Sequence, residues 1–184
     1  MICITSLSGG TGELTVQPAE KGLNGRVPPK PLTILIIEDD ATTRLALACM
    51  VADDGYQVVL ATSAENALQR LPVIDPDVIL CDFLLEGMNG RQFCEALKAS
   101  ERWRYVPVIV VTRMDAVCLI ADLLRSGADD VLVKPVRGEE LRARVSVALR
   151  TRMQYLQLRR APRLYGSVSA RQTVPPTRRL SAYA

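Results

Sequence analysis

Five short apolar runs, separated by segments of helical length, constrain the fold of this chain more than any other feature. Three of the five are continuous apolar blocks, as in strands that are buried on both faces of a parallel sheet. The runs are LTILII (32–37), QVVL (57–60), DVILC (77–81), VPVIVV (106–111) and DVLV (130–133). The segments between them have helical spacing: Ala41–Asp53, Ser63–Leu71, Asn89–Ala99, Asp115–Arg125 and a long one from Gly138. The pattern predicts an α/β domain with a doubly wound parallel sheet of five strands and five helices.

The same spacing predicts which side of some helices faces the core. In the first helix, Leu45, Cys49 and Ala52 lie on one stripe. The helix at 115–125 has more apolar residues than one stripe facing the core needs. In the last helix the apolar stripe continues beyond Arg150, so we expect this helix to extend past the edge of the domain.

Charge and composition divide the chain into three parts. The net charge is +3, yet residues 150–184 contain eight Arg and no acidic residue, so the body of the chain is acidic. Residues 1–30 are rich in Gly, Ser, Thr and Pro, and we expect a disordered extension there. We expect the folded domain at 31–150, and a helix extension with a basic disordered tail at 151–184.

Composition also excludes several classes of function. The chain contains no histidine, which excludes His-ligated metals and both Ser-His-Asp and Cys-His catalysis. Five cysteines without a CxxC spacing indicate reduced, mostly buried thiols in a cytoplasmic protein. The chain has no uncharged apolar stretch of about 18 residues, so we expect no membrane span.

Polar residues follow four of the five predicted strands. In a doubly wound sheet, ligands bind at the carboxyl ends of the strands. Clustered carboxylates there suit a hard cation such as Mg²⁺, while a lysine and a hydroxyl can hold a transferring phosphoryl group. Asp82 is the best candidate for the nucleophile. The residues at these strand ends are Glu38, Asp39, Asp40, Asp82, Thr112 and Lys134.

Four segments, ILIIEDD, DVILCDFLLEGMNG, VPVIVVT and GADDVLVKP, occur in this order and resemble the receiver domain of two-component response regulators. The resemblance covers roughly residues 32–150. It implies a flavodoxin-like receiver fold with strand order 2-1-3-4-5. It also implies that Asp82 accepts a phosphoryl group from a histidine kinase or a phosphotransfer protein, with Thr112 and Lys134 completing the catalytic set.

The family resemblance further implies a metal site. Mg²⁺ (or Mn²⁺) would be held by Asp39, Asp82 and the backbone carbonyl of Leu84, with Glu38 acting mainly through water. Such a protein is not a conventional enzyme, because it promotes only its own phosphorylation and a slow loss of the phosphoryl group.

Four positions depart from the family pattern, namely Arg113, Val131, Glu86 and Val136. Arg113 stands where a small residue usually follows the hydroxyl, and we expect this cation to modulate the phosphosite. Val131 stands where the family carries its switch aromatic, so the usual threonine–tyrosine rearrangement does not carry over. These departures leave open an alternative, a pseudo-receiver scaffold that acts independently of phosphorylation.

Partner expectations follow from the resemblance and from the tail. We expect an output protein, or a second copy of the chain, to bind through the 115–125 helix, the fifth strand and the 138–158 helix. We do not expect nucleic acid as a partner, because no helix-turn-helix follows and tail arginines alone bind non-specifically. The long last helix resembles a connector helix, so a second alternative is the receiver portion of a larger regulator of the cyclase or phosphodiesterase type.

Overall fold

Seven strands and five helices make up the described part of the chain. The computed structural model describes residues 3–6, 14–17, 31–52 and 54–160. The strands are β1 (Cys3–Ser6), β2 (Leu14–Gln17), β3 (Thr33–Ile37), β4 (Gln57–Ala61), β5 (Val78–Asp82), β6 (Val108–Thr112) and β7 (Asp130–Val133). The helices are α1 (Ala41–Ala52), α2 (Ala64–Ile74), α3 (Gly90–Ala99), α4 (Val117–Arg125) and α5 (Gly138–Arg160).

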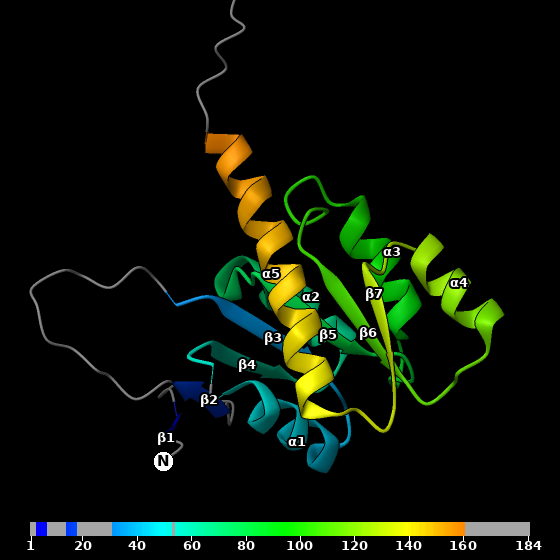
Figure 1. The fold of residues 1–184 in the computed structure, drawn as a ribbon, viewed down its shortest axis with the longest axis horizontal. Coiled ribbons are helices and arrows are strands. Elements are labelled where there is room, and N and C mark those ends of the chain that lie inside the picture. The colour runs from blue at the N-terminus through cyan, green and yellow to red at the C-terminus, as the bar shows by residue number, and fades with distance from the viewer. Residues whose placement is uncertain (1–2, 7–13, 18–30, 53, 161–184) are drawn as a thin grey trace, which may run out of the picture.

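A parallel sheet forms the centre of the fold (Figure 1). Its five parallel strands lie in the order β4-β3-β5-β6-β7, which is the predicted order 2-1-3-4-5. Strands β3, β5 and β6 are buried along their whole length, as their continuous apolar sequences require. The expected doubly wound α/β fold is therefore confirmed.

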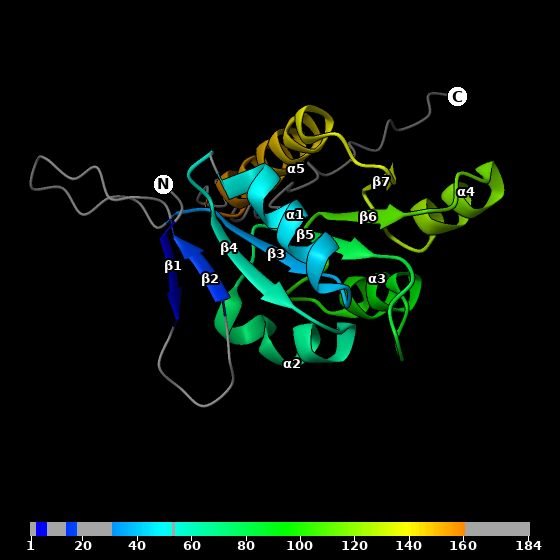
Figure 2. The same ribbon diagram turned by 90° about the horizontal axis from the view of Figure 1, so that it is seen from below.

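The helices enclose the sheet from both faces. Figure 2 shows α1 and α5 on one face and α2 and α3 on the other. One apolar cluster lies between the sheet and α2, α3 and α4, and the other between the sheet and α1 and α5. Among the described residues, no helix is both long and apolar enough to span a membrane.

Strands β1 and β2 lie within residues 1–30, where we expected disorder. For these two short segments the expectation was wrong. They pair with each other in antiparallel fashion, and β2 pairs with β4. The sequences CITS and LTVQ contain β-branched residues that favour strands. Without them, β4 would leave a row of unpaired backbone groups at the edge of the sheet. The rest of the expected N-terminal extension, and the tail from residue 161, lie outside the described residues.

Helix α1 buries a different stripe from the one that the sequence predicted. Leu47, Ala48 and Val51 pack into the core, whereas Leu45 is 47% exposed and Cys49 is exposed. Residues 45–52 are all apolar, so spacing alone could not select the buried side. The contact of α1 with β3, β4 and α5 selects it.

Helix α5 continues beyond the sheet and is attached there by an unusual arginine. Arg152 is only 8% exposed, and its Nη1 donates to the carbonyl oxygen of Tyr105 at 3.3 Å. The ring of Tyr105 stacks on Tyr155 with centroids 4.1 Å apart. These contacts hold the later turns of α5 against the loop that precedes β6.

Candidate functional site

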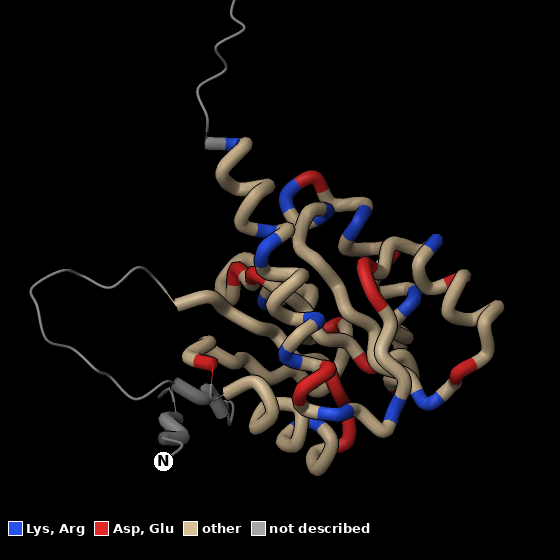
Figure 3. Tube along the Cα trace, in the orientation of Figure 1, with Lys and Arg blue, Asp and Glu red and all other residues tan. Residues whose placement is uncertain are grey.

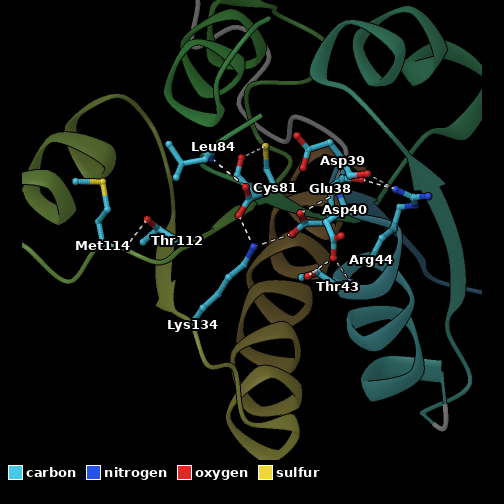
Figure 4. Close-up of polar contacts among 11 residues, drawn as sticks. Glu38, Asp39, Asp40, Thr43, Arg44, Cys81, Leu84, Thr112, Met114 and Lys134 are labelled. Atoms are coloured by element: carbon cyan, nitrogen blue, oxygen red, sulfur yellow. Dashed lines mark hydrogen bonds and ion pairs between the residues drawn. The ribbon is translucent and has the colours of Figure 1, made fainter. Parts of the chain in front are cut away.

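Three carboxylates meet where β3 and β5 end (Figure 4). Glu38 follows β3 and is 2% exposed, and Asp82 ends β5 and is 6% exposed. One carboxylate oxygen from each of Glu38, Asp39 and Asp82 lies within 4.8 Å of the others. Parallel neighbouring strands bring their carboxyl ends to one edge, and this explains how acids 44 positions apart come together. The acidic cluster predicted from the sequence is present.

Lys134 places one positive charge between two of the acids. Its Nζ lies 2.8 Å from Oε2 of Glu38 and 2.7 Å from Oδ1 of Asp82. Burial lowers the pKa of Lys134, but the hydrogen bonds to Asp82 and Glu38 outweigh burial, so this pKa is raised. The ammonium therefore stays charged at neutral pH. The following peptide bond, Lys134–Pro135, is cis.

The pKa of Glu38 is raised, because its neighbours only partly offset the effect of burial. Burial raises the pKa of Glu38, and the negative charge of Asp82 raises it further. The hydrogen bond from Lys134 acts in the opposite direction, but the pKa remains above its usual value. A buried acid that is held next to another acid is typical of sites that bind a cation.

Asp40 has a structural role and lies outside this cluster. Its Oδ1 accepts hydrogen bonds from the backbone N–H and the hydroxyl of Thr43, each at 2.7 Å. These bonds lower the pKa of Asp40. Asp40 thus caps the start of α1, which is the ordinary role of an aspartate before a helix.

The loop after β5 is tied to the cluster and to α2. The backbone N–H of Leu84 donates to Oδ2 of Asp82 at 3.0 Å. Oε1 of Glu65, in the first turn of α2, accepts the N–H of Met88 at 2.7 Å. Gly90 begins α3 so close to β5 that an added Cβ would lie 2.6 Å from the carbonyl oxygen of Asp82. Sequence reasoning missed Glu65, although a carboxylate at a helix start is a visible signal.

Thr112 lies at the end of β6 and is fully buried. Its Oγ1 accepts the N–H of Met114 at 3.1 Å. Within the described part of the chain, the hydroxyl makes no hydrogen bond to the acidic cluster, and Figure 4 shows it turned toward Met114. The structure therefore places Thr112 at the expected edge of the sheet but engages it with the start of the next loop.

Arg113 stands at the rim of the site and is exposed. It lines a cavity of about 220 Å³ together with Glu38, Asp39, Asp40, Asp82, Leu84 and Lys134. It also lines a neighbouring groove of about 510 Å³ that runs along α1. Val131, at the position of the expected aromatic, is half-buried and packs against the core on the α2–α4 side.

Sequence comparisons extend over the same part of the chain. Residues 34–146 match the family model described as the response regulator receiver domain. The transcriptional regulatory protein AfsQ1 of Streptomyces coelicolor is 37% identical over 119 residues, which are 64% of this chain and 51% of that protein. The DNA-binding response regulator MtrA of Mycobacterium tuberculosis is 35% identical over 118 residues, 64% of this chain and 50% of that protein. The chain thus spans about half the length of these curated relatives.

Solved structures agree with the sequence matches. A signal receiver domain of a histidine kinase from Syntrophus aciditrophicus is 31% identical, with a TM-score of 0.60 over 64% of this chain and 89% of that one. A two-component response regulator from Clostridium difficile is 28% identical, with a TM-score of 0.60 over 65% of this chain and 96% of that one.

The relatives correct one expectation about partners. We did not expect nucleic acid, because the sequence contains no helix-turn-helix after the last helix. Several similar proteins are nevertheless named as DNA-binding or transcriptional regulators, so the exclusion of nucleic acid was wrong. A segment without a helix-turn-helix pattern does not exclude nucleic acid, because the arginines of residues 150–184 could contact phosphates.

Proposed function

This chain belongs to the response regulator receiver family, and from that premise we propose that it is a switch controlled by phosphorylation of Asp82. The phosphoryl donor would be a histidine kinase or a phosphotransfer protein in the cytoplasm. The contact that carries the proposal is the bridge from Lys134 to both Glu38 and Asp82, at 2.8 and 2.7 Å. A half-buried lysine between a nucleophilic acid and a second acid suits transfer of an anionic group.

In the proposed reaction, a carboxylate oxygen of Asp82 attacks the phosphorus atom of a phosphohistidine. The O–P bond forms as the P–N bond breaks, and the imidazole leaves with the electron pair. Lys134 stabilises negative charge on the phosphoryl oxygens. Thr112 can donate its hydroxyl hydrogen to one of them, since its bond with Met114 uses only an oxygen lone pair. Loss of the phosphoryl group to water returns Asp82 to its starting form, so the chain is not a conventional enzyme.

We propose that Asp39 and Asp82 hold Mg²⁺ or Mn²⁺, with the backbone carbonyl of Leu84, and that Glu38 contributes through water. The donor set fits Mg²⁺, because it consists of oxygen atoms only. Lys134 brings a single positive charge to the two carboxylates that it contacts, those of Glu38 and Asp82. When bound, such a cation neutralises charge on the phosphoryl oxygens. The protein contributes the fixed directions of the carboxylates around it.

The test is incubation of the full chain with Mg²⁺ and acetyl phosphate, followed by intact mass measurement. We expect the wild type to gain the mass of one phosphoryl group and Asp82→Asn to gain none, because the amide is not a nucleophile. Asp122→Asn, an exposed change on α4, is the matched control and should behave as wild type. Equal uptake by Asp82→Asn would overturn the assignment, and a wild type without uptake would favour the pseudo-receiver scaffold.

A second candidate function, an output that involves DNA, is supported by the names of the curated relatives and by the tail. Residues 150–184 contain eight Arg and no acid, and Figure 3 shows only basic charge on the described end of α5. Fluorescence anisotropy with a labelled duplex tests it. Binding that falls steeply between about 50 and 200 mM salt would support contact with phosphates. No binding at the lower salt concentration would remove this candidate.

A further inference from the structure

Arg44 contacts the main chain of both acids that follow β3. Its Nη1 donates to the carbonyl oxygen of Glu38 at 2.8 Å and to that of Asp39 at 3.1 Å. The residue lies in the first turn of α1, where its own N–H bonds to the carbonyl oxygen of Asp40 at 2.9 Å. One guanidinium nitrogen therefore joins the start of the helix to two successive peptide groups of the turn before it.

Among the described residues, few other bonds hold this turn, and the one that spans it is long: the N–H of Asp40 donates to Oε1 of Glu38 at 3.4 Å. At one end, the N–H of Glu38 bonds to the carbonyl oxygen of Ala61 in β4 at 3.1 Å. At the other end, Asp40 caps α1. Asp39 lies between them, and no side chain or amide of the described residues donates to its carboxylate. The direction of that carboxylate therefore depends on the main chain that Arg44 holds.

Arg44 and Lys134 contact different atoms of the acidic site. Lys134 bonds to the carboxylates of Glu38 and Asp82, while Arg44 bonds to the main chain of Glu38 and Asp39. Figure 4 shows the two cations approaching the acids from different sides. The guanidinium of Arg44 is positively charged, so it also offsets repulsion among the three carboxylates without occupying their oxygens.

We propose that Arg44 is a positioning residue for cation binding, which acts by fixing the direction of Asp39. This inference rests on the proposed function, since it concerns the same site. Residues that orient metal ligands typically change metal affinity by 10- to 100-fold when they are lost. Loss of Arg44 should therefore raise the Mg²⁺ concentration that gives half-saturation. It should leave the maximal rate of phosphorylation at saturating Mg²⁺ nearly unchanged.

The experiment measures phosphorylation by acetyl phosphate as a function of Mg²⁺ concentration in the full chain. For Arg44→Ala we expect half-saturation at about tenfold higher Mg²⁺, with a maximal rate within about twofold of wild type. Arg44→Lys, which keeps a charged donor, should recover part of the affinity. Arg125→Ala is the matched control, because among the described residues Arg125 pairs only with Asp122 on the surface of α4, and its Mg²⁺ dependence should equal that of wild type.

Two outcomes would overturn the inference. The first is an unchanged half-saturation in Arg44→Ala, whether or not the maximal rate falls. The second is an equal shift of the half-saturation in Arg125→Ala. Failure of the proposed function is distinct, since in that case the wild type itself takes up no phosphoryl group at any Mg²⁺ concentration.

Discussion

Arg113 adds a second cation, which is exposed, to the lining of the cavity that contains Asp82 and Lys134. A phosphoryl group on Asp82 would bring negative charge into this cavity, and Arg113 is near enough to line it. We expect Arg113→Ala to change the rates of phosphorylation and dephosphorylation by a few-fold, while the free energy of unfolding changes by less than about 0.5 kcal/mol. Rates from phosphorylation time courses and urea unfolding curves measure the two effects, and rates identical to wild type would mean that Arg113 is merely solvated.

The cysteines divide into two classes by burial. Cys81 and Cys94 are buried, whereas Cys49 and Cys118 are exposed, so the expectation of mostly buried thiols holds for only half of these four. Burial raises the pKa of Cys94 to about 12 and raises that of Cys81 as well. Because the thiolate is the reactive form, alkylation of the folded protein at pH 8 should modify Cys49 and Cys118 and spare the other two. Peptide mapping by mass spectrometry measures this, and rapid modification of Cys94 in the native state would contradict it.

The position of a site residue can be predicted from the sequence where the strand order of the sheet fixes it. It cannot be predicted where hydrogen bonds within a loop fix it. Asp82 and Lys134 could be placed because each stands at the end of a strand in one parallel sheet. The bond from Met114 to Thr112 could not, because it depends on the path of a few loop residues. Arg44 escaped notice because a contact from a helix to the preceding turn has no characteristic spacing.

Among the elements, α2 supports the loop after β5 through a single carboxylate. Glu65 accepts the N–H of Met88, in the same loop as Leu84, whose carbonyl is a proposed metal ligand. We expect Glu65→Ala to weaken Mg²⁺ binding about tenfold by releasing this loop. Glu65→Gln should retain most of the affinity, because its amide oxygen can still accept. Isothermal titration calorimetry measures both affinities, and Glu95→Ala, an exposed change on α3, is the control that should leave Mg²⁺ affinity unchanged.

The prediction of elements depended on how distinctive each apolar pattern is. Strands β3, β5 and β6 could be recognised because a buried parallel strand is apolar throughout. The buried side of α1 could not, because residues 45–52 are apolar on every side. Strands β1 and β2 escaped notice because each has only four residues and lies among the Gly and Ser residues that usually mark loops.

On the scale of the whole molecule, α5 joins the domain to the basic tail. Truncation after Leu149 would remove Arg152 and Tyr155, together with their contacts to Tyr105. Because a stacked aromatic pair alone contributes about 0.5–1.5 kcal/mol, we expect a lower melting temperature for this truncation. The site lies at the other end of the helix, so phosphorylation by acetyl phosphate should continue.

A second truncation, after Arg160, is the control for the first. It keeps every described contact of α5, and we expect both its melting temperature and its phosphorylation to match wild type. Thermal unfolding followed by circular dichroism measures the two variants side by side. Equal melting temperatures for both truncations would contradict a stabilising role for Arg152 and Tyr155.

The length of α5 has a mechanical consequence. The helix starts four residues after Lys134 and has 23 residues, so it spans about 34 Å at 1.5 Å per residue. Its first turn follows Lys134 closely in the chain, and its last turn lies about 34 Å farther along the helix axis, which is about the diameter of a small domain. A tilt of about 5° at the near end would sweep the far end through about 3 Å, given that length. The backbone of Arg160 therefore moves farthest when the first turn of α5, which begins four residues after Lys134, changes its direction.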